Sequence, residues 1–136
     1  MAYKRRINIK AVAWGVLTDT GGSLVVGAIL AIITVVALAM NGTPKNEIEV
    51  YLHGPIVLIL GMIIGFCFTV LGGFVAGRVS RNFEVLHGSI VDFIGIIIGS
   101  LFWTTLPLWY NSVSLLEVVP LGMLGGRIAE VSRKKL

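Results

Sequence analysis

The sequence predicts an all-α, polytopic membrane protein whose four transmembrane helices form two repeated helical hairpins. Its 136 residues are 56% hydrophobic and only 13% charged, whereas about a quarter of the residues in soluble domains are charged. A membrane-spanning helix needs about 20 mostly apolar residues. Four such segments can be placed, at about 11–40, 55–78, 87–110 and 112–130. We therefore expect a single transmembrane domain over residues 1–136.

Two motifs recur in the chain and predict the duplication. The pattern G-x3-D-x2-G is present in the first and third apolar segments, as Gly15, Asp19 and Gly22 and as Gly88, Asp92 and Gly95. The second and fourth segments end alike, with Gly73, Ala76, Gly77 and Arg78 spaced as are Gly122, Gly125, Gly126 and Arg127. Each hairpin would then be one copy of an ancestral unit.

The basic residues predict the orientation. Ten of the eleven fall on one side of a four-span protein, and Lys45 alone falls on the other; the ten are Lys4, Arg5, Arg6, Lys10, Arg78, Arg81, Arg127, Arg133, Lys134 and Lys135. The positive-inside rule puts this side, with both termini, in the cytoplasm. These residues would attract anionic lipids at the cytoplasmic face, which explains the net charge of +4 without nucleic acid. We expect the cell inner membrane.

The first segment is expected to be a retained transmembrane helix. Its apolar run of about 30 residues is twice the length of a signal-peptide core, and Asp19 interrupts its first half. Paired glycines weaken a helix locally, so a bend is expected at Thr20-Gly21-Gly22-Ser23. The loop at 41–54 opens with the turn signal Asn41-Gly42-Thr43-Pro44, and the stretch after it is expected to form a short interfacial helix or an extended strap.

The second segment carries a stripe of small residues at every fourth position: Gly61, Gly65, Thr69, Gly73 and Gly77. Such stripes let helix backbones approach closely in membranes. Packing within the chain is the simpler interpretation, and self-association through the GxxxG units is the alternative. Cys67 is expected to be a small buried apolar residue.

One helix face of the third segment carries Gly88, Asp92, Gly95 and Gly99. The side chain of Asp92 is therefore expected to point toward a neighbouring helix. The segment ends in a predicted aromatic belt, with Trp103, Trp109 and Tyr110. The fourth segment follows after so short a turn that an antiparallel hairpin is expected.

The two intramembrane aspartates are the candidate functional residues. One aspartate at a helix centre costs about 2.5–3.5 kcal/mol on insertion scales. The preferred expectation is two charge pairs that join Asp19 and Asp92 to Arg78 and Arg127. The alternative is a polar cavity in which both aspartates relay protons or cations, with Glu117 as a third acidic group.

No motif predicts an enzyme, a cofactor or a metal. His53 and His87 fall on opposite sides of the membrane in the four-span arrangement, so they cannot share a metal, and each is expected at an interface. The sequence contains no P-loop, no nucleophile elbow and no zinc-protease motif.

The motif Gly72-Gly73-Phe74-Val75-Ala76-Gly77-Arg78, followed by Leu86-His87-Gly88, resembles a group of small four-helix prokaryotic membrane proteins of uncharacterised function. The resemblance covers the middle third of the chain. It implies the fold and a prokaryotic inner membrane, and it adds no activity.

Taken together, these patterns favour an accessory or scaffolding subunit that acts by helix packing, in a homo-oligomer or a larger membrane complex. The competing class is a small ion- or proton-coupled transporter or channel that uses Asp19 and Asp92.

Overall fold

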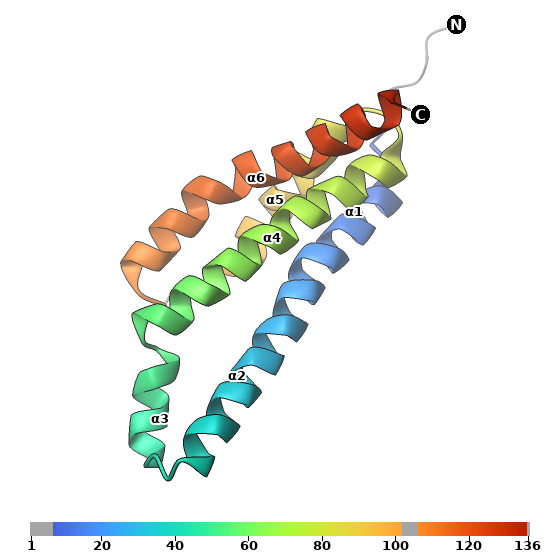
Figure 1. Ribbon diagram of the computed structural model, residues 1–136. Helices are drawn as coiled ribbons and strands as arrows, with labels where there is room; N and C mark the ends of the chain where they lie inside the picture. Colours follow the sequence, from blue (N-terminus) through green and yellow to red (C-terminus); the bar gives the residue numbers. More distant parts are fainter. Residues whose placement is uncertain (1–6, 102–105, 136) are drawn as a thin grey trace, which may run out of the picture.

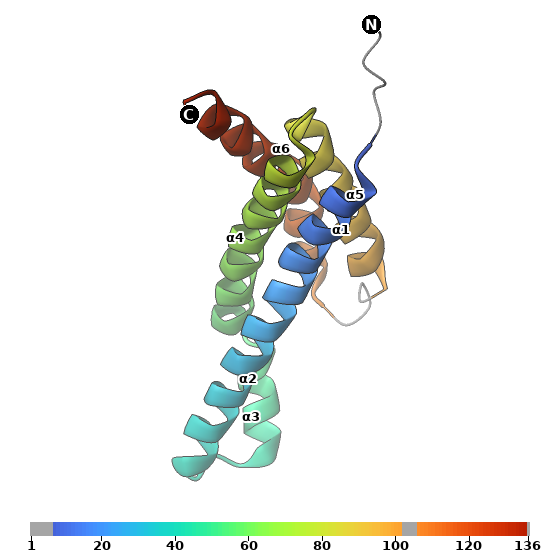
Figure 2. The same cartoon turned by 90° about the vertical axis from the view of Figure 1, so that its right-hand side faces the viewer.

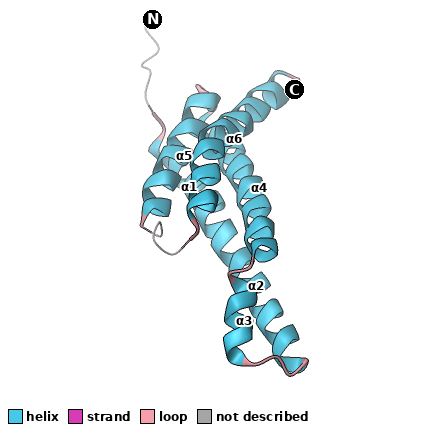
Figure 3. Cartoon of the chain, turned by 90° about the vertical axis from the view of Figure 1, so that its left-hand side faces the viewer, coloured by secondary structure: helices cyan, strands magenta, loops and turns pink. Residues whose placement is uncertain are grey.

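The computed structural model describes residues 7–101 and 106–135, and these residues form helices joined by short loops (Figures 1 and 3). The elements, in chain order, are α1 (Ile9–Val16), the π-helix η1 (Leu17–Gly21), α2 (Gly22–Met40), α3 (Lys45–Leu52), α4 (Pro55–Ser80), α5 (Glu84–Ser100) and α6 (Leu108–Lys134). The all-α prediction is confirmed.

Local sequence explains where several helices begin and end. Asn8 caps α1, because its side chain accepts a hydrogen bond of 3.3 Å from the Ala11 N–H. Pro55 is the first residue of α4, where its missing N–H costs nothing. Arg81 ends α4 in the left-handed conformation, with φ 58°. The turn at 81–83 then reverses the chain into α5.

Three helices are long and apolar enough to cross a membrane, as judged by length and composition: Ile9–Met40, Pro55–Ser80 and Leu108–Lys134. The chain is thus a multi-pass membrane protein. The expected third span, 87–110, corresponds to α5, which has 17 residues and a length of about 25 Å at 1.5 Å per residue. It falls short of the hydrocarbon thickness of about 30 Å, and part of the predicted span, with Trp103, lies outside the described residues.

The first candidate span is one long rod built from α1, η1 and α2. Where a bend was expected, the chain forms a π-helix, Leu17–Gly21, and the long helix continues through it. Figure 2 shows α2 and α3 extending together away from the bundle of α1, α4, α5 and α6. Gly22 still packs on the Phe68 ring of α4, whereas Gly27 has no neighbour within 4 Å. No residue of α2 is buried.

Close glycine contacts hold the bundle together on the side of the termini. A Cβ on Gly15 would lie 2.9 Å from the carbonyl oxygen of Gly72, where α1 crosses α4. Gly73 and Gly88 both lie against the backbone of Gly122 in α6. Because these backbones touch, helix pairing here rests on van der Waals packing, as is usual in membranes. A small apolar cluster of Val12, Ala76 and Val91 fills the space between α1, α4 and α5.

The small-residue stripe of α4 is used only in part, which corrects the expectation for the whole stripe. Gly73 and Gly77 contact other helices, and a Cβ on Gly77 would lie 2.8 Å from the Ala129 Cβ. Gly61 and Gly65 have nothing within 4 Å, and the same is true of Gly99 on α5. The reason is that α2 diverges from α4 and leaves the outer half of α4 uncovered.

Both ends of the described chain lie at the same end of the bundle (Figure 1). The start of α1, the α4–α5 turn and the end of α6 meet there, and with them the described basic residues other than Lys45, namely Lys10, Arg78, Arg81, Arg127, Arg133, Lys134 and Lys135. We call this the basic end. Lys45 begins α3 at the opposite end.

Candidate functional site

Asp19 lies inside η1 and is buried against α4, with 8% of its surface exposed. Its Oδ1 accepts a hydrogen bond of 3.2 Å from the Thr69 hydroxyl. Its Oδ2 faces α5, where a Cβ on Gly95 would lie 3.4 Å away. Ten residues separate Asp19 from the start of α1, so the carboxyl group lies about 15 Å along the helix from the basic end.

Hydroxyl side chains support the π-helix around Asp19. A π-helix widens the turn, and it occurs mostly as a single turn inside an α-helix, frequently at a functional site. The Ser23 hydroxyl donates to the Asp19 carbonyl at 2.7 Å, and the Thr18 hydroxyl donates to the Trp14 carbonyl at 2.9 Å. These bonds satisfy backbone oxygens in the region where the regular helix ladder changes.

Asp92 lies in α5 and is completely buried, with 0% of its surface exposed. Its carboxylate faces the backbone of Gly122 in α6. Neither carboxylate oxygen has a partner with hydrogen-bond geometry in the described part of the chain. A buried carboxylate without a cationic partner is costly in free energy. The nearness of Asp19 adds an electrostatic interaction between the two acidic groups.

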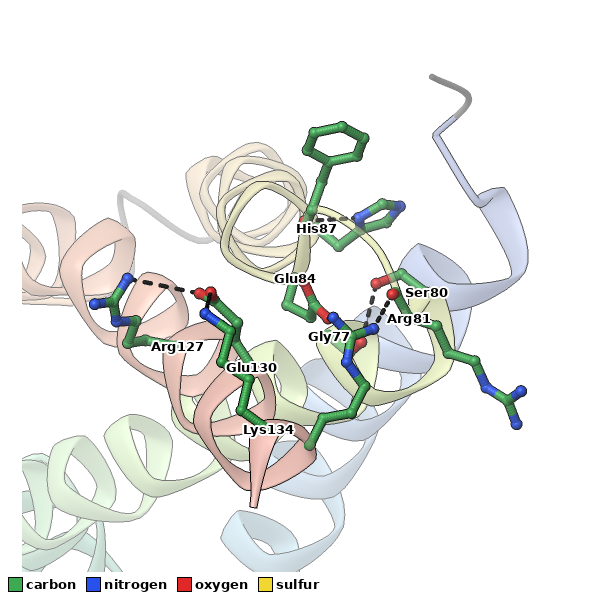
Figure 4. Close-up of polar contacts among 10 residues, drawn as sticks. Gly77, Ser80, Arg81, Glu84, His87, Arg127, Glu130 and Lys134 are labelled. Atoms are coloured by element: carbon green, nitrogen blue, oxygen red, sulfur yellow. Dashed lines mark hydrogen bonds and ion pairs between the residues drawn. The ribbon is translucent and has the colours of Figure 1, made fainter. Parts of the chain in front are cut away.

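The expected charge pairs with Arg78 and Arg127 are not formed. Within residues 7–101 and 106–135, neither aspartate takes part in an ion pair. Arg127 instead approaches Glu130 at 3.5 Å with 68% of its side chain exposed (Figure 4). Arg78 is also exposed. A long arginine at a helix end extends toward water rather than back into the bundle, which explains the difference.

A cavity of about 280 Å³ opens beside Asp19, between η1, α2, α4, α5 and α6. Polar groups in its wall come from Asp19, Thr20, Ser23, Thr69 and Tyr110. The rest of its wall is apolar or glycine, and it includes Gly65 and Gly99, two of the unpacked positions described above. A second cavity of about 320 Å³ shares Gly95, Gly99, Tyr110 and Val118 with the first. The missing glycine side chains therefore leave room beside a carboxylate.

His87 ties the start of α1 to α5 at the basic end. Its Nε2 accepts a hydrogen bond of 3.0 Å from the Asn8 N–H, and its Nδ1 lies 2.9 Å from the Phe83 carbonyl oxygen (Figure 4). These partners require a proton on Nδ1 and none on Nε2. His87 is 1% exposed, so it is buried between helices at the basic end, where it joins α1 to α5.

Glu84 and Arg133 form an ion pair between α5 and α6 at the basic end. The Arg133 guanidinium lies 2.5 Å from Glu84, whose side chain is 6% exposed, and also donates to the Arg81 carbonyl. Arg133 thereby fixes the end of α6 to the turn between α4 and α5, and the Glu84 side chain enters this contact from the first turn of α5 (Figure 4). Nothing in the sequence motifs singled out either residue.

The remaining candidates lie elsewhere. Glu117 is exposed and lines neither cavity, so it is not a third acidic group beside Asp19. His53 ends α3, where its Nδ1 lies 3.0 Å from the Glu49 carbonyl oxygen. Cys67 is exposed on α4, which corrects the expectation of burial. The described residues contain no group of three or more potential metal ligands.

Comparisons with protein-family models, with curated proteins and with solved structures give no match to this chain. The resemblance carried by the Gly72–Arg78 motif therefore gains no support from a family match. What stands is an all-helical, multi-pass membrane protein with three long apolar helices.

Proposed function

We propose that this chain is a small transporter or channel for protons or small cations, and that Asp19 and Asp92 are the charged groups of its pathway. The observation that carries the proposal is that both carboxyl groups are buried without a cationic partner in the described residues. An ionisable residue within a membrane is costly and usually has a partner or a function. With the expected arginines pointing outward, the partner is missing, and a mobile cation or proton is the counter-charge that remains.

The surroundings of the aspartates support this choice over a purely structural role. Asp19 borders a cavity with hydroxyl groups in its wall, and the π-helix that carries it interrupts the regular ladder of a transmembrane helix. Single-turn π-helices within longer helices are frequent at functional sites. Two nearby carboxylates repel each other when both are ionised, and binding of one monovalent cation or proton would remove that repulsion.

For the topology we propose four membrane spans, of which α5 is shorter than the hydrocarbon thickness of the bilayer. α5 packs against α4 and α6 and is sheltered by them, so a short helix is tolerated there. Both termini and the basic end would face the cytoplasm under the positive-inside rule, next to anionic lipids of the inner membrane. The two hairpins, α1–α4 and α5–α6, would be the duplicated units.

Flux measurements in liposomes test the proposal. The purified protein is reconstituted, and proton and monovalent cation fluxes are compared for wild type, Asp19→Asn, Asp92→Asn and the control Glu117→Gln. We expect at least a tenfold loss of flux in each Asp variant and none in the Glu117 variant, since Glu117 is exposed and away from the cavity. Wild-type flux no higher than that of protein-free liposomes would contradict the proposal.

A second candidate is the accessory or scaffolding subunit, in a homo-oligomer or a larger complex. It is favoured by α2, an apolar helix of 19 residues with none buried in the chain itself. A neighbouring protein helix could cover it as well as lipid could. Cross-linking from a cysteine at Gly27, which has open space around it, tests this candidate in native membranes: a discrete cross-linked species supports it, and monomer alone contradicts it.

A further inference from the structure

We infer that the cavity beside Asp19 binds a small apolar ammonium ion, that is, an organic monocation with a hydrocarbon body. The inference deepens the proposed function and rests on it, because Asp19 is assigned the role of cation ligand. It concerns the class of ligand, which the positions of the two aspartates do not determine by themselves.

The charge of the ligand follows from Asp19. Its carboxyl group is the one acidic group in the cavity wall, and only its Oδ1 has a hydrogen bond in the described structure, from Thr69. Oδ2 faces toward Gly95, at the side where the cavity lies. In a low-dielectric site an uncompensated negative charge attracts a cation strongly. Tyr110 in the same wall adds an aromatic ring, and ammonium groups bind favourably to such rings.

The apolar body of the ligand follows from the rest of the wall. Leu24, Ile98 and Val118 contribute aliphatic surface, and glycines contribute most of the remainder. Small-molecule sites are mostly apolar, with a few polar groups that fix orientation. A bare Ca²⁺ ion takes six to eight oxygen ligands, carboxylates prominent among them, whereas this wall contains a single carboxylate. One carboxylate in an aliphatic wall suits an organic cation better.

The volume sets the size of the ligand. The cavity measures about 280 Å³, several times the volume of about 30 Å³ that one water molecule occupies in the liquid, so it has room for a small organic cation. The adjoining cavity of about 320 Å³ extends this space along α5 and α6. Gly65 and Gly99 keep the first cavity open, because a side chain at either position would project into free space.

Calorimetric titration of the protein in detergent micelles, with protein-free micelles as the blank, tests the inference. The probe is benzyltrimethylammonium, and the comparator is neopentylbenzene, its uncharged isostere. We expect saturable binding of the cation and at least tenfold weaker binding of the isostere. Equal binding of the two compounds would overturn the inference, because the site would then recognise only apolar surface.

Two variants separate charge from space. Asp19→Asn should weaken binding of the cation at least tenfold and leave binding of the isostere unchanged. Gly99→Leu fills the cavity without changing a charge and should abolish binding. The matched control is Gly61→Leu, which also projects into open space but lines neither cavity, and it should bind as wild type does. Wild-type binding by Gly99→Leu would overturn the inference.

The outcome is distinguishable from that of the flux test. If proton flux requires Asp19 and Asp92 but the ammonium probe does not bind, the transport proposal stands and this inference is wrong. If the probe binds with the expected variant pattern but no flux is measurable, the site stands and transport is wrong.

Discussion

The Thr69 hydroxyl donates a hydrogen bond of 3.2 Å to the Asp19 carboxylate and so joins two helices at positions 50 residues apart in the chain. Both side chains are more than nine-tenths buried. Gly72, one turn further along α4, lets the backbones approach there, since a Cβ on Gly72 would lie 2.7 Å from the Asp19 Cβ. The acidic group is therefore held in place by a neutral hydroxyl rather than by an arginine.

Removal of this hydroxyl should loosen the contact between η1 and α4. Thr69→Val keeps the shape and loses the donor, and we expect a loss of about 0.6–1.7 kcal/mol in the free energy of unfolding, the range for hydrogen bonds between membrane helices. Thr69→Ser keeps the donor and should retain most of the stability. Unfolding by SDS titration, followed by circular dichroism, compares the two variants. Equal stability of both would argue that the bond contributes nothing.

Two glycines of α4 should respond in opposite ways to alanine. Gly73 lies against the backbone of Gly122, so Gly73→Ala must push α4 and α6 apart, at a cost of about 1–3 kcal/mol for overpacking. Gly61 has no neighbour within 4 Å, so Gly61→Ala should be neutral, or should stabilise by up to about 1 kcal/mol from helix propensity. The same SDS titration measures both, and similar losses in the two variants would contradict this packing.

Arg133 should contribute to stability through Glu84. Arg133→Ala leaves the buried Glu84 side chain and the Arg81 carbonyl without their guanidinium partner, and we expect a loss of about 1–3 kcal/mol, as for a buried polar group left unpaired. Lys135→Ala is the control, because Lys135 is exposed and forms no ion pair within the described residues. Thermal unfolding in detergent compares the two variants. An equal unfolding midpoint for both would contradict a stabilising contact between Arg133 and Glu84.

His87 should protect the start of α1 from opening. His87→Phe fills the same buried space but cannot accept the hydrogen bond of the Asn8 N–H. Hydrogen exchange at Asn8 should become at least tenfold faster, which corresponds to about 1.4 kcal/mol. His53→Phe changes the exposed histidine that ends α3 and should leave Asn8 unaffected. Unchanged exchange in His87→Phe would remove the role assigned to His87.

Features that depend on composition along the chain could be predicted from sequence. The all-helical class, the long apolar helices and the basic end follow from runs of apolar residues and from the positions of Lys and Arg, because the membrane selects these directly. Of the two structures expected after the turn signal at Asn41–Pro44, a short helix or an extended strap, the helix is found, as α3. Gly73 and Gly88 lie against the backbone of Gly122, at the kind of close contact that small residues allow.

Features that depend on how helices cross could not be predicted. The stripe on α4 runs unbroken from Gly61 to Gly77, but nothing in its spacing says that α2 diverges and leaves Gly61 and Gly65 open. The expected Asp–Arg pairs are absent, since Arg127 extends from the exposed face of α6 and its ion-pair partner, Glu130, lies one turn along the same helix. Thr69 was expected only as a small packing residue. The sequence signal for its contact with Asp19 was a hydroxyl residue in the middle of an otherwise apolar helix.

Thiol labelling measures most directly whether water reaches the cavity beside Asp19. In a Cys67→Ala background, Thr20→Cys places a thiol in the cavity wall, and Leu17→Cys places one on the outer surface of the same helix, where Leu17 is 60% exposed. A membrane-impermeant, cationic thiol reagent is added to protein in liposomes. The account predicts labelling of Thr20→Cys, slowed by benzyltrimethylammonium, and no labelling of Leu17→Cys, which faces lipid. Labelling of Leu17→Cys with no labelling of Thr20→Cys would contradict a hydrated site at Asp19.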